Sequence, residues 1–399
     1  METGPILRAM IRNKLGVILI TLQIAFTMTV VINAIFIINE RSRLMARPSG
    51  LDEANTFFLT SVGFGDDFNE AVTVADDLAA LRQTPGVVNA TVTNAIPVSG
   101  SGSNTGVRLV DDETAATSFA AYYRVDEHAI ETMDLELIAG RNFAAQDIQW
   151  RQGGERTATE QLIISRQLAS TLFPEREPNG VLGETLFTLG SQPHQVIGIV
   201  EQLQGPWPAN SSVELAMLQP MHAFDGSTTY LIRTEPGERD RSMVDVEEML
   251  VASNGNRLIR NLMSLQQTRE ESYQVDSAMS TILWVVIITL VFITCMGIVG
   301  LAVFGINRRR KQIGTRRALG ATRTQILRYF MVSGIGVALG AVLTIGFSIL
   351  LTSNFNMPVM AWYYTPLGML ALVVIGQLAV LGPSSGAART EPAIATRSV

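Results

Sequence analysis

The sequence predicts an α-helical membrane protein that carries a large α+β domain outside the membrane, on three observations. Hydrophobic residues make up 47% of the 399-residue chain and charged residues only 17%, and the mean hydropathy is +0.25, which is too apolar for an ordinary soluble protein. Residues 39–280 are polar and long enough to form a core of their own. Three stretches contain no Asp, Glu, Lys or Arg, and they lie between Lys14 and Glu40, between Asp276 and Arg308, and between Arg328 and Arg389.

The lengths of the uncharged stretches predict four transmembrane helices in a one-plus-three layout around the polar domain. Crossing about 30 Å of hydrocarbon takes about 20 helical residues, so the first two stretches each hold one span. The third holds two, because the polar run 353–358 ends in a proline and the aromatic residues 362–364 suit the lipid headgroup region. The predicted spans are 16–38, 281–305, 329–352 and 363–382, after an amphipathic helix at 1–15.

The distribution of charge predicts the orientation. The segments before the first span, between the second and third spans, and after the fourth span contain 13 basic and 2 acidic residues, whereas 39–280 contains 17 basic and 34 acidic residues. Because Lys and Arg are in excess on the cytoplasmic side of membrane proteins, we expect both termini, the loop 306–328 and the tail 383–399 in the cytoplasm. A cleaved signal peptide is disfavoured, because the first apolar run is about twice the usual 7 to 15 residues.

The outer domain contains two similar patterns of strand, helix and strand. The first is predicted at 55–62, 70–83 and 87–93, and the second at 228–233, 240–252 and 257–265. Two such halves predict a ferredoxin-like split unit, formed by 50–104 and 206–265.

Between these halves the sequence is rich in β-branched residues and turn signals. We therefore expect a mostly β insert at 105–205, with one helix at 165–173. Polar helical stalks are predicted at 39–48 and 265–280. The single cysteine, Cys295, lies in the second predicted span, so the outer domain has no disulfides.

A search for chemistry predicts no catalytic, cofactor-binding or metal-ligating residues. The chain has no G-x-x-x-x-G-K-[ST] phosphate loop, so it does not bind ATP in that way. His128, His194 and His222 are far apart and lack the spacing of a metal site. The predicted spans contain no carboxylate or histidine, which disfavours ion-driven transport. A serine- and glycine-rich run at 99–103 and an acidic cluster at 111–113 are predicted as a loop and a solvated turn.

Small residues recur every four positions in the third predicted span. This spacing allows the backbones of two helices to approach closely, either within one subunit or across a dimer seam. The residues are Gly336, Gly340, Thr344 and Ser348.

The loop 306–328 is the most distinctive segment of the chain. Its arginines suit a basic loop that binds anionic lipid headgroups, but that interpretation leaves the small residues unexplained, and these permit close approach of another protein. The candidate contact residues are Arg309, Gln312, Ile313, Gly314, Arg316, Arg317, Ala318, Leu319, Gly320 and Ala321.

This loop resembles the signature R-x-x-[EQ]-I-G-x-x-[RK]-A-x-G-A of the FtsX/MacB (type VII) superfamily of ABC transporter permeases. The phrases at 85–87, 96–97, 139–143 and 196–200 are similar to the MacB-type periplasmic domain. The resemblance implies that the loop is a coupling helix that docks on a nucleotide-binding domain. It also implies that the split unit is the porter part of the outer domain and the insert at 105–205 the Sabre part.

The resemblance further implies a permease subunit of a MacB-like exporter in the bacterial inner membrane, where ATP-driven motion is transmitted to the periplasmic domain. A fused ATPase domain ahead of the first span is missing, so we expect ATP and Mg on a separate ATPase subunit and no cofactor on this chain. The other expected partners are a second permease copy or a paralogue, a periplasmic adaptor, an outer-membrane channel and membrane lipid, but no nucleic acid. The tail at 383–389 lacks two of the family's arginines, which leaves a heterodimer open beside a homodimer.

Three alternatives stay open beside the exporter. A lipoprotein-releasing permease belongs to the same family and would hand a lipidated protein to a carrier. A non-transporting receptor would need an output domain, and the largest predicted cytoplasmic segment has only about 22 residues. A membrane-anchored hydrolase would need a nucleophile and a base, which the sequence does not offer. The outer domain does not distinguish among macrolides, peptides, siderophores and lipoproteins as cargo.

Overall fold

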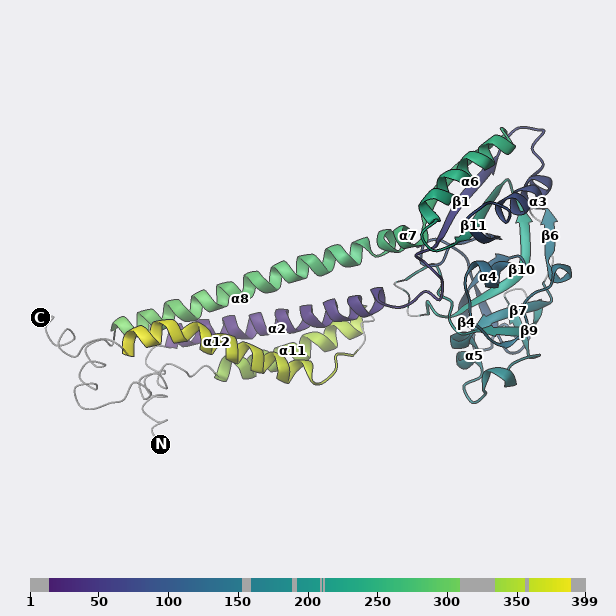
Figure 1. Cartoon of the computed structure of the whole chain (residues 1–399). Coiled ribbons are helices and arrows are strands. Elements are labelled where there is room, and N and C mark those ends of the chain that lie inside the picture. Colours follow the sequence, from purple (N-terminus) through teal and green to yellow (C-terminus); the bar gives the residue numbers. More distant parts are fainter. Residues whose placement is uncertain are drawn as a thin grey trace, which may run out of the picture. The chain divides into compact units, whose positions relative to one another are not determined.

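The computed structural model describes residues 14–152, 159–188, 192–208, 210, 212–308, 334–355 and 359–388 (Figure 1). The chain divides into two compact units. The helical unit consists of Met1–Arg43 and Asp276–Val399, and the inserted unit of Leu44–Val275. The inserted unit therefore interrupts the sequence of the helical unit once.

Long apolar helices form the described part of the helical unit. Two stretches are long and apolar enough to cross a membrane by length and composition, Thr21–Met45 and Gln274–Gly300, and shorter apolar stretches are Ala341–Leu350 and Tyr364–Ala379. The predicted spans 16–38 and 281–305 lie inside two of the helices, and the fourth predicted span, 363–382, begins one residue before a third helix. The third predicted span, 329–352, lies in the remaining helix from residue 334 onward. The helices are α2 (Lys14–Met45), α8 (Gln274–Arg308), α11 (Gly334–Phe355) and α12 (Tyr364–Ala388).

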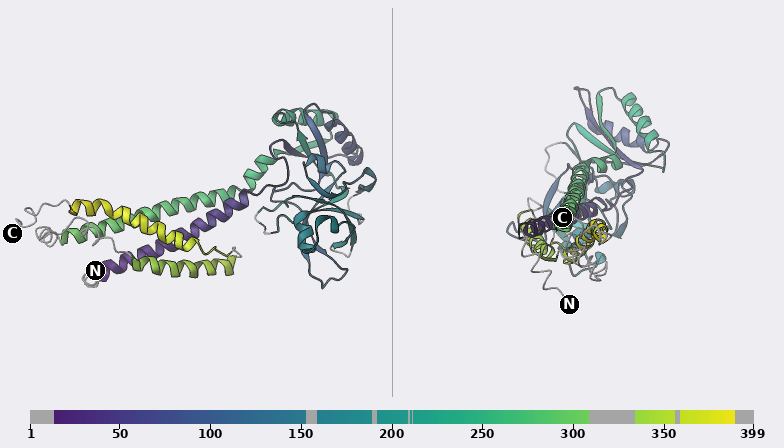
Figure 2. Two further views of the ribbon diagram at one scale, coloured as in Figure 1. Left: turned by 60° about the horizontal axis from the view of Figure 1, so that its bottom comes forward. Right: turned by 90° about the vertical axis from the view of Figure 1, so that its left-hand side faces the viewer.

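Helix α2 packs against both α8 and α12, and the three helices run alongside one another (Figure 2). Thr27 and Thr294 form a hydrogen bond between their hydroxyl oxygens, 2.7 Å apart, which links α2 to the antiparallel α8. On the α12 side, Phe36 meets the ring of Tyr364 edge-on at 5.5 Å. A Cβ atom added at Gly368 would lie 2.3 Å from Cδ1 of Ile32, so these two helices pack closely there.

The smaller sheet of the inserted unit has four antiparallel strands in the order β12-β1-β11-β2. Helix α3 connects β1 to β2, and α6 connects β11 to β12, which is the connectivity of two βαβ pieces in one sheet. Both helices pack on one face of the sheet, where Phe57 and Leu59 are fully buried. The elements are β1 (Thr56–Gly63), α3 (Glu70–Leu81), β2 (Val87–Thr93), β11 (Ser227–Thr234), α6 (Arg239–Ser253) and β12 (Arg257–Ser264).

The larger sheet has eight strands in the path β4-β3-β8-β9-β7-β10-β6, with β5 paired to β9. Strand β4 also pairs with β10 in parallel, so six of the strands form a closed ring. Its strands are β3 (Asn104–Arg108), β4 (Ser118–Val125), β5 (Leu137–Gly140), β6 (Gln149–Gln152), β7 (Gln161–Ser165), β8 (Thr185–Thr188), β9 (Gln192–Val200) and β10 (Ala216–Phe224).

Short helices complete the inserted unit. Helix α5 begins after Ser165, whose hydroxyl oxygen accepts a hydrogen bond from the backbone N–H of Leu168 at 3.2 Å, as an N-cap does. The short helices are α4 (Ala129–Thr132), η1 (Ala145–Asp147), α5 (Arg166–Leu172), η2 (Pro178–Gly180) and α7 (Leu265–Ser272).

The boundary expected at residue 206 is wrong, because β10 belongs to the larger sheet rather than to the split unit. Residues 216–222 of β10 are all buried, since the strand pairs with β4, β6 and β7. A strand buried on both faces shows no alternation of polar and apolar residues, so its sequence does not reveal which sheet it joins.

One hydrophobic core lies between the two sheets. It includes Phe58 and Leu231 from the smaller sheet, Tyr123 and Val125 from the larger sheet, and Leu265 from α7. The two sheets therefore share apolar packing rather than meeting through a linker.

Candidate functional site

The predicted coupling residues Arg309 to Ala321 lie outside the described part of the chain. Gly336 and Gly340 lie near the beginning of α11. Thr344 and Ser348 of the same helix are 0% and 8% exposed, although residues beside them are open to the surroundings. This side of α11 therefore faces other parts of the same chain at these two positions.

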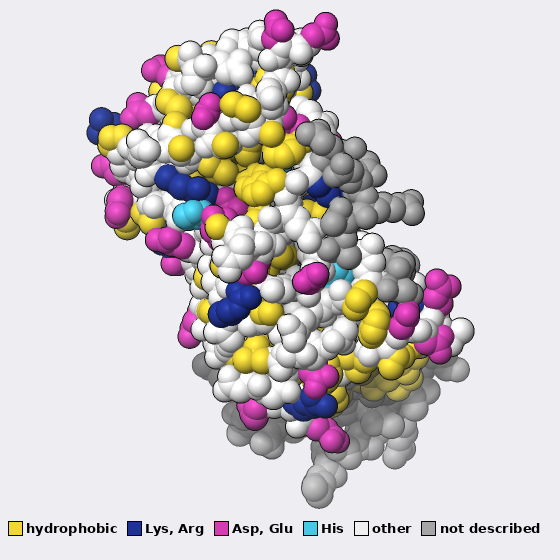
Figure 3. Space-filling view, turned by 90° about the vertical axis from the view of Figure 1, so that its right-hand side faces the viewer, with side chains coloured by type: hydrophobic (Ala, Val, Ile, Leu, Met, Phe, Trp, Pro, Cys, Tyr) yellow, Lys and Arg dark blue, Asp and Glu magenta, His cyan; other side chains and the backbone are white. Residues whose placement is uncertain are grey.

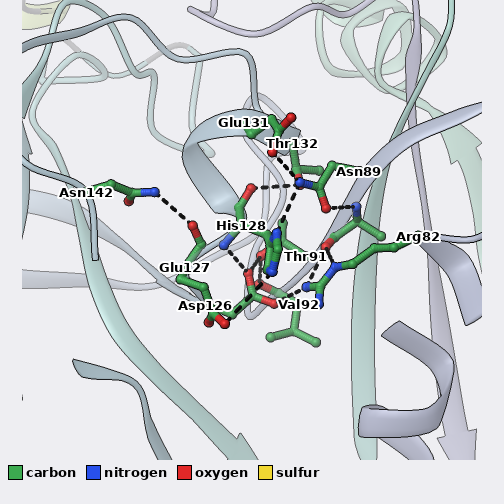
Figure 4. A network of polar contacts seen from close by, with 11 residues as sticks. Arg82, Asn89, Thr91, Val92, Asp126, Glu127, His128, Glu131, Thr132 and Asn142 are labelled. Carbon is green, nitrogen blue, oxygen red and sulfur yellow. Dashed lines mark hydrogen bonds and ion pairs between the residues drawn. The ribbon is translucent and has the colours of Figure 1, made fainter. Parts of the chain in front are cut away.

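A buried carboxylate joins the two sheets of the inserted unit (Figure 4). Asp126 follows β4 of the larger sheet and is 1% exposed. Thr91, on β2 of the smaller sheet, donates a hydrogen bond from Oγ1 to Oδ1 of Asp126 at 2.6 Å. Arg82, at the end of α3, donates from Nη2 to Oδ2 at 2.7 Å. The backbone N–H of His128, just before α4, donates to Oδ1 at 3.0 Å. Donors from β2, from the end of α3 and from the start of α4 thus satisfy one carboxylate.

A second set of polar contacts extends this joint along β2. The side-chain amide of Asn89 donates to Oε2 of Glu131 at 2.6 Å and lies 3.1 Å from Nδ1 of His128, and both partners belong to the α4 region of the chain (Figure 4). The guanidinium of Arg82 also donates from Nε and Nη2 to the carbonyl of Ala90, at 3.0 and 2.8 Å. We name Arg82, Asn89, Thr91, Asp126, His128 and Glu131 the sheet joint.

The electrostatics of the sheet joint favour a structural role. Burial raises the pKa of Asp126, and the hydrogen bond from Thr91 and the charge of Arg82 act in the opposite direction. The joint offers ion pairing and hydrogen bonding between two sheets, which resists their separation because breaking it would leave a buried carboxylate without partners.

A second buried ion pair lies inside the smaller sheet and its helices. Arg257 Nη1 and Asp77 Oδ2 are 2.6 Å apart, and both side chains are almost fully buried. The hydroxyl of Tyr230 donates to the same carboxylate oxygen at 2.6 Å. This pair ties α3 to β12 and β11.

A hollow of about 380 Å³ lies on the side of the smaller sheet away from α3 and α6. Its lining includes the apolar side chains of Phe58, Ile96 and Met263 and the hydroxyls of Ser99 and Ser101. Glu271 is the charged residue among the described side chains that line it, an arrangement that suits a ligand with both apolar and polar groups.

The three histidines have separate surroundings. His128 belongs to the sheet joint, and His194 lies 2.9 Å from the hydroxyl of Thr188. His222 packs against the rings of Trp150 and Phe224, which also stack on each other. On the face drawn in Figure 3, hydrophobic side chains gather toward the middle, and acidic side chains lie beside them as well as around the margin.

Sequence reasoning missed the sheet joint. Thr91 and Asp126 are 35 positions apart and sit in ordinary strand and turn sequence, so no spacing connects them. The one available signal is that Asp126 follows the alternating strand 118–125 directly, where a carboxylate often ends a strand for local reasons.

Two models of known protein families match most of the chain. A family model described as MacB-like periplasmic core domain matches residues 15–247, which is more than half of the chain. A second model, described as FtsX-like permease C-terminal, matches residues 284–392.

Relatives of known name agree with these models. The chain is 24% identical over 300 residues to the uncharacterized ABC transporter permease YknZ of Bacillus subtilis, covering 73% of this chain and 72% of YknZ. It is 23% identical over 413 residues to the macrolide export ATP-binding/permease protein MacB of Escherichia coli K12, covering 96% of this chain. The chain spans 58% of the length of that MacB.

Solved structures similar to this chain include the periplasmic region of MacB from Actinobacillus actinomycetemcomitans, with a TM-score of 0.35, 15% identity, and coverage of 57% of this chain and 97% of that one. The extracellular domain of YknZ from Gram-positive bacteria has a TM-score of 0.32 and 16% identity, and the match covers 51% of this chain and 100% of that domain.

Because the MacB-like core model spans more than half of the sequence and the FtsX-like model follows it, the chain belongs to the MacB-like family of ABC transporter permeases.

Proposed function

We propose that this chain is the permease subunit of a MacB-like ABC exporter, in which ATP hydrolysis on a separate subunit drives a conformational change of the periplasmic domain. FtsX-like permeases are generally non-catalytic transmembrane subunits, and the family implies an ABC ATPase as partner. ATP and Mg would be bound by that partner. The loop residues Arg309 to Ala321 would form the contact with it.

The observation that carries this proposal is the construction of the inserted unit. Its chain enters after α2 and leaves before α8, and its two sheets share one hydrophobic core and the sheet joint. A displacement of the two connections would therefore move the whole unit rather than one sheet alone. That behaviour suits a part that transmits force to a substrate or to another protein.

The proposed arrangement in the membrane has four spans, with both termini in the cytoplasm and the inserted unit in the periplasm. The smaller sheet would be the ferredoxin-like porter part, and the larger sheet the Sabre-like part. Labelling with a membrane-impermeant maleimide tests this orientation in a Cys295→Ala background. Ser101→Cys should react from outside intact spheroplasts and Ser384→Cys only after lysis, and the reverse pattern would overturn the orientation.

The remaining partners are proposed from the family and the name of the E. coli relative. A second permease copy or a paralogue would complete the membrane pathway, because four helices are few for a translocation route. Substrate would enter from the periplasm and pass to an adaptor and an outer-membrane channel.

The first experiment is purification of the tagged full-length chain in mild detergent, with identification of the proteins that co-purify and an ATPase assay of the same sample. We expect an ABC ATPase in stoichiometric amount. The double variant Arg317→Glu, Gly320→Glu should lose it, because added negative charge and side-chain volume oppose close docking at the loop. Arg397→Glu, in the tail, is the matched control and should retain it.

Two outcomes would change the proposal. If wild-type protein recovers no ATPase, or the loop variant retains it as the control does, the coupling assignment fails. Triacylated lipoproteins in stoichiometric amount in the purified sample would replace export with lipoprotein release.

A further inference from the structure

The end of helix α2 presents carbonyl groups that an arginine from a distant part of the sequence satisfies. Arg269, on α7, donates from Nη2 to the carbonyl of Met45 at 2.8 Å, and also to the carbonyl of Arg47. Its Nη1 pairs with Oε1 of Glu53 at 2.5 Å. All of these residues belong to the inserted unit. The guanidinium of Arg269, on the helix by which the chain leaves the unit, thus binds the segment by which the chain enters it.

Tyr273, just after α7, strengthens the same contact. Its hydroxyl donates to the carbonyl of Leu44 at 3.1 Å. The guanidinium of Arg269 lies over its ring, 5.5 Å from the centroid, within the range of a cation–π interaction. The last carbonyls of a helix lack partners inside the helix and carry partial negative charge, so a cation and a hydroxyl placed there stabilise the helix end.

The chemistry of the site requires arginine. Met45 O, Arg47 O and the Glu53 carboxylate are three acceptors in different directions, and a guanidinium offers five N–H donors in a fixed planar fork. A lysine has one ammonium at a single point and cannot reach all three acceptors together. The side chains of Arg269 and Glu53 are only 18% and 23% exposed, so water competes weakly for these donors.

Each side of the contact is anchored in the body of the inserted unit. On the entering side, Gln202 donates from Nε2 to the carbonyl of Pro48 at 2.8 Å, and the backbone N–H of Gln204 donates to the carbonyl of Ser49 at 3.0 Å. On the leaving side, Ser264 caps α7 by accepting from the N–H of Gln267 at 3.1 Å, and Leu265 is buried in the shared core. Arg269 therefore connects two segments that are each fixed separately.

We propose that Arg269 is a positioning residue that ties the entering and leaving connections of the inserted unit, so that the unit receives their displacement as a pair. This inference rests on the proposed function, because it assigns Arg269 a role in transmitting the ATP-driven motion. Without the tie, one connection would move without the other. The displacement would then distort the connecting segments and would not move the inserted unit.

The test compares Arg269→Gln and Arg269→Lys with a matched control, Arg239→Gln. Arg239 is 21% exposed and also donates to a backbone carbonyl near the entering segment, that of Ala54 at 2.9 Å. Its described contact with α7 is a long hydrogen bond from Nη1 to Oε1 of Gln266 at 3.4 Å, and none of its described contacts is with residues 44–49. The control thus removes a similar arginine from the same neighbourhood and leaves the contacts of Arg269 with Met45 and Arg47 intact.

The first measurement uses the full-length permease alone in lipid nanodiscs and follows amide hydrogen exchange. Exchange in residues 44–55 should rise on the order of tenfold in Arg269→Gln, because local opening is governed by the contacts that hold a segment. The rise in Arg269→Lys should be smaller but measurable, and Arg239→Gln should match wild type in residues 44–49. Unchanged exchange in Arg269→Gln would overturn the tie.

The second measurement uses the permease with its co-purified ATPase, trapped with ATP and vanadate. In wild type and Arg239→Gln, trapping should change exchange within the inserted unit. In Arg269→Gln, hydrolysis should continue while this change falls on the order of tenfold, a loss within the usual range of coupling between sites. If Arg269→Gln keeps the full change, the positioning role is wrong. A purely structural role would instead lower thermal stability and hydrolysis together.

The two measurements separate failure of the inference from failure of the proposed function. If no ATPase is recovered, the proposed function fails, and the exchange of the permease alone still decides whether the tie exists. If Arg269→Gln does not fold, Tyr273→Phe removes only the donor to Leu44 and should raise exchange at residues 44–49. Wild-type exchange in that variant would overturn the tie.

Discussion

His222 shows how one buried side chain sets a pH dependence. Its ring packs at 5.6 Å from Trp150 and 5.2 Å from Phe224, between centroids. Burial lowers the pKa of His222 to about 4, and the positive charge of Arg124 acts in the same direction. The unfolded chain has a pKa of about 6.5 at this residue, so the unfolded state binds the proton more readily.

We predict that the inserted unit loses about 3 kcal/mol of its free energy of unfolding through His222 as the pH falls from about 6.5 to about 4. The contribution is fully present above the unfolded pKa and is lost on acidification. His222→Gln should flatten this part of the profile, measured as the midpoint of thermal unfolding against pH. Parallel profiles of variant and wild type would contradict the assignment. The raised pKa of Asp126 also affects the pH profile, but it does so equally in wild type and His222→Gln. It therefore does not affect the difference between their two profiles.

The buried pair of Asp77 and Arg257 makes a second prediction at the scale of single residues. Arg257→Met should lower the free energy of unfolding by about 3 to 5 kcal/mol, because it leaves a buried carboxylate without its cation. Arg241→Met is the control, since Arg241 forms an exposed pair with Asp245 at 3.4 Å, and its effect should stay within about 0.5 kcal/mol. Urea unfolding followed by tryptophan fluorescence measures both, and equal effects would show that the pair contributes little.

At the scale of elements, close packing in the helical unit occurs at particular glycines. A Cβ at Gly368 would meet Ile32, whereas a Cβ placed at Gly346 of α11 would meet no described atom within 4 Å apart from its chain neighbours and the nearby backbone of its own helix. Gly368→Leu should therefore destabilise the contact of α12 with α2 by about 1 to 3 kcal/mol through overpacking.

Gly346→Leu is the matched control for Gly368→Leu and should leave the protein close to wild type. Size-exclusion chromatography after heating in detergent compares the surviving monodisperse fraction of each variant. If the two variants lose the same fraction, packing against Ile32 does not distinguish the two positions.

Elements with a clear period were predictable from sequence. Val74, Leu78 and Leu81 recur at helical spacing, and all three are buried in α3 against the smaller sheet. The strand at 87–93 agrees in both bounds with β2, because Pro85 and Gly86 mark a turn before it. The sequence does not reveal that β10 belongs to the larger sheet, because a strand buried on both faces has no alternation of polar and apolar residues.

The sheet joint was beyond sequence reasoning for a different reason. The partners of Asp126 come from α3, β2 and α4, and only the fold brings these elements together. Local sequence can suggest that a carboxylate ends a strand, but it does not indicate that the carboxylate will be buried beside Arg82. The same holds for Arg269, which is 224 positions from Met45.

At the scale of the whole molecule, the sheet joint should decide whether the inserted unit moves as one body. We predict that Arg82→Gln raises amide exchange on the order of tenfold along β2 and the turn 126–128, because Asp126 loses its cation and Ala90 loses two donors. Exchange in the core of α5 should stay unchanged.

Arg166→Gln is the control for Arg82→Gln, because Arg166 forms an exposed pair with Glu201 that spans only the larger sheet and its helix. It should leave exchange in β2 at the wild-type level. If Arg82→Gln leaves β2 equally protected, the shared hydrophobic core alone holds the two sheets together.

The strand order of the smaller sheet also dictates when it can form. Strand β11 lies between β1 and β2 and pairs with both, yet it follows β2 in the chain by more than 130 residues. Strands β1 and β2 therefore lack the strand that pairs with both of them until nearly the whole inserted unit has been synthesised. Formation of the larger sheet then brings β11 close to β1 and β2. During that interval two apolar strands are exposed to aggregation, so we expect slow folding limited by the larger sheet.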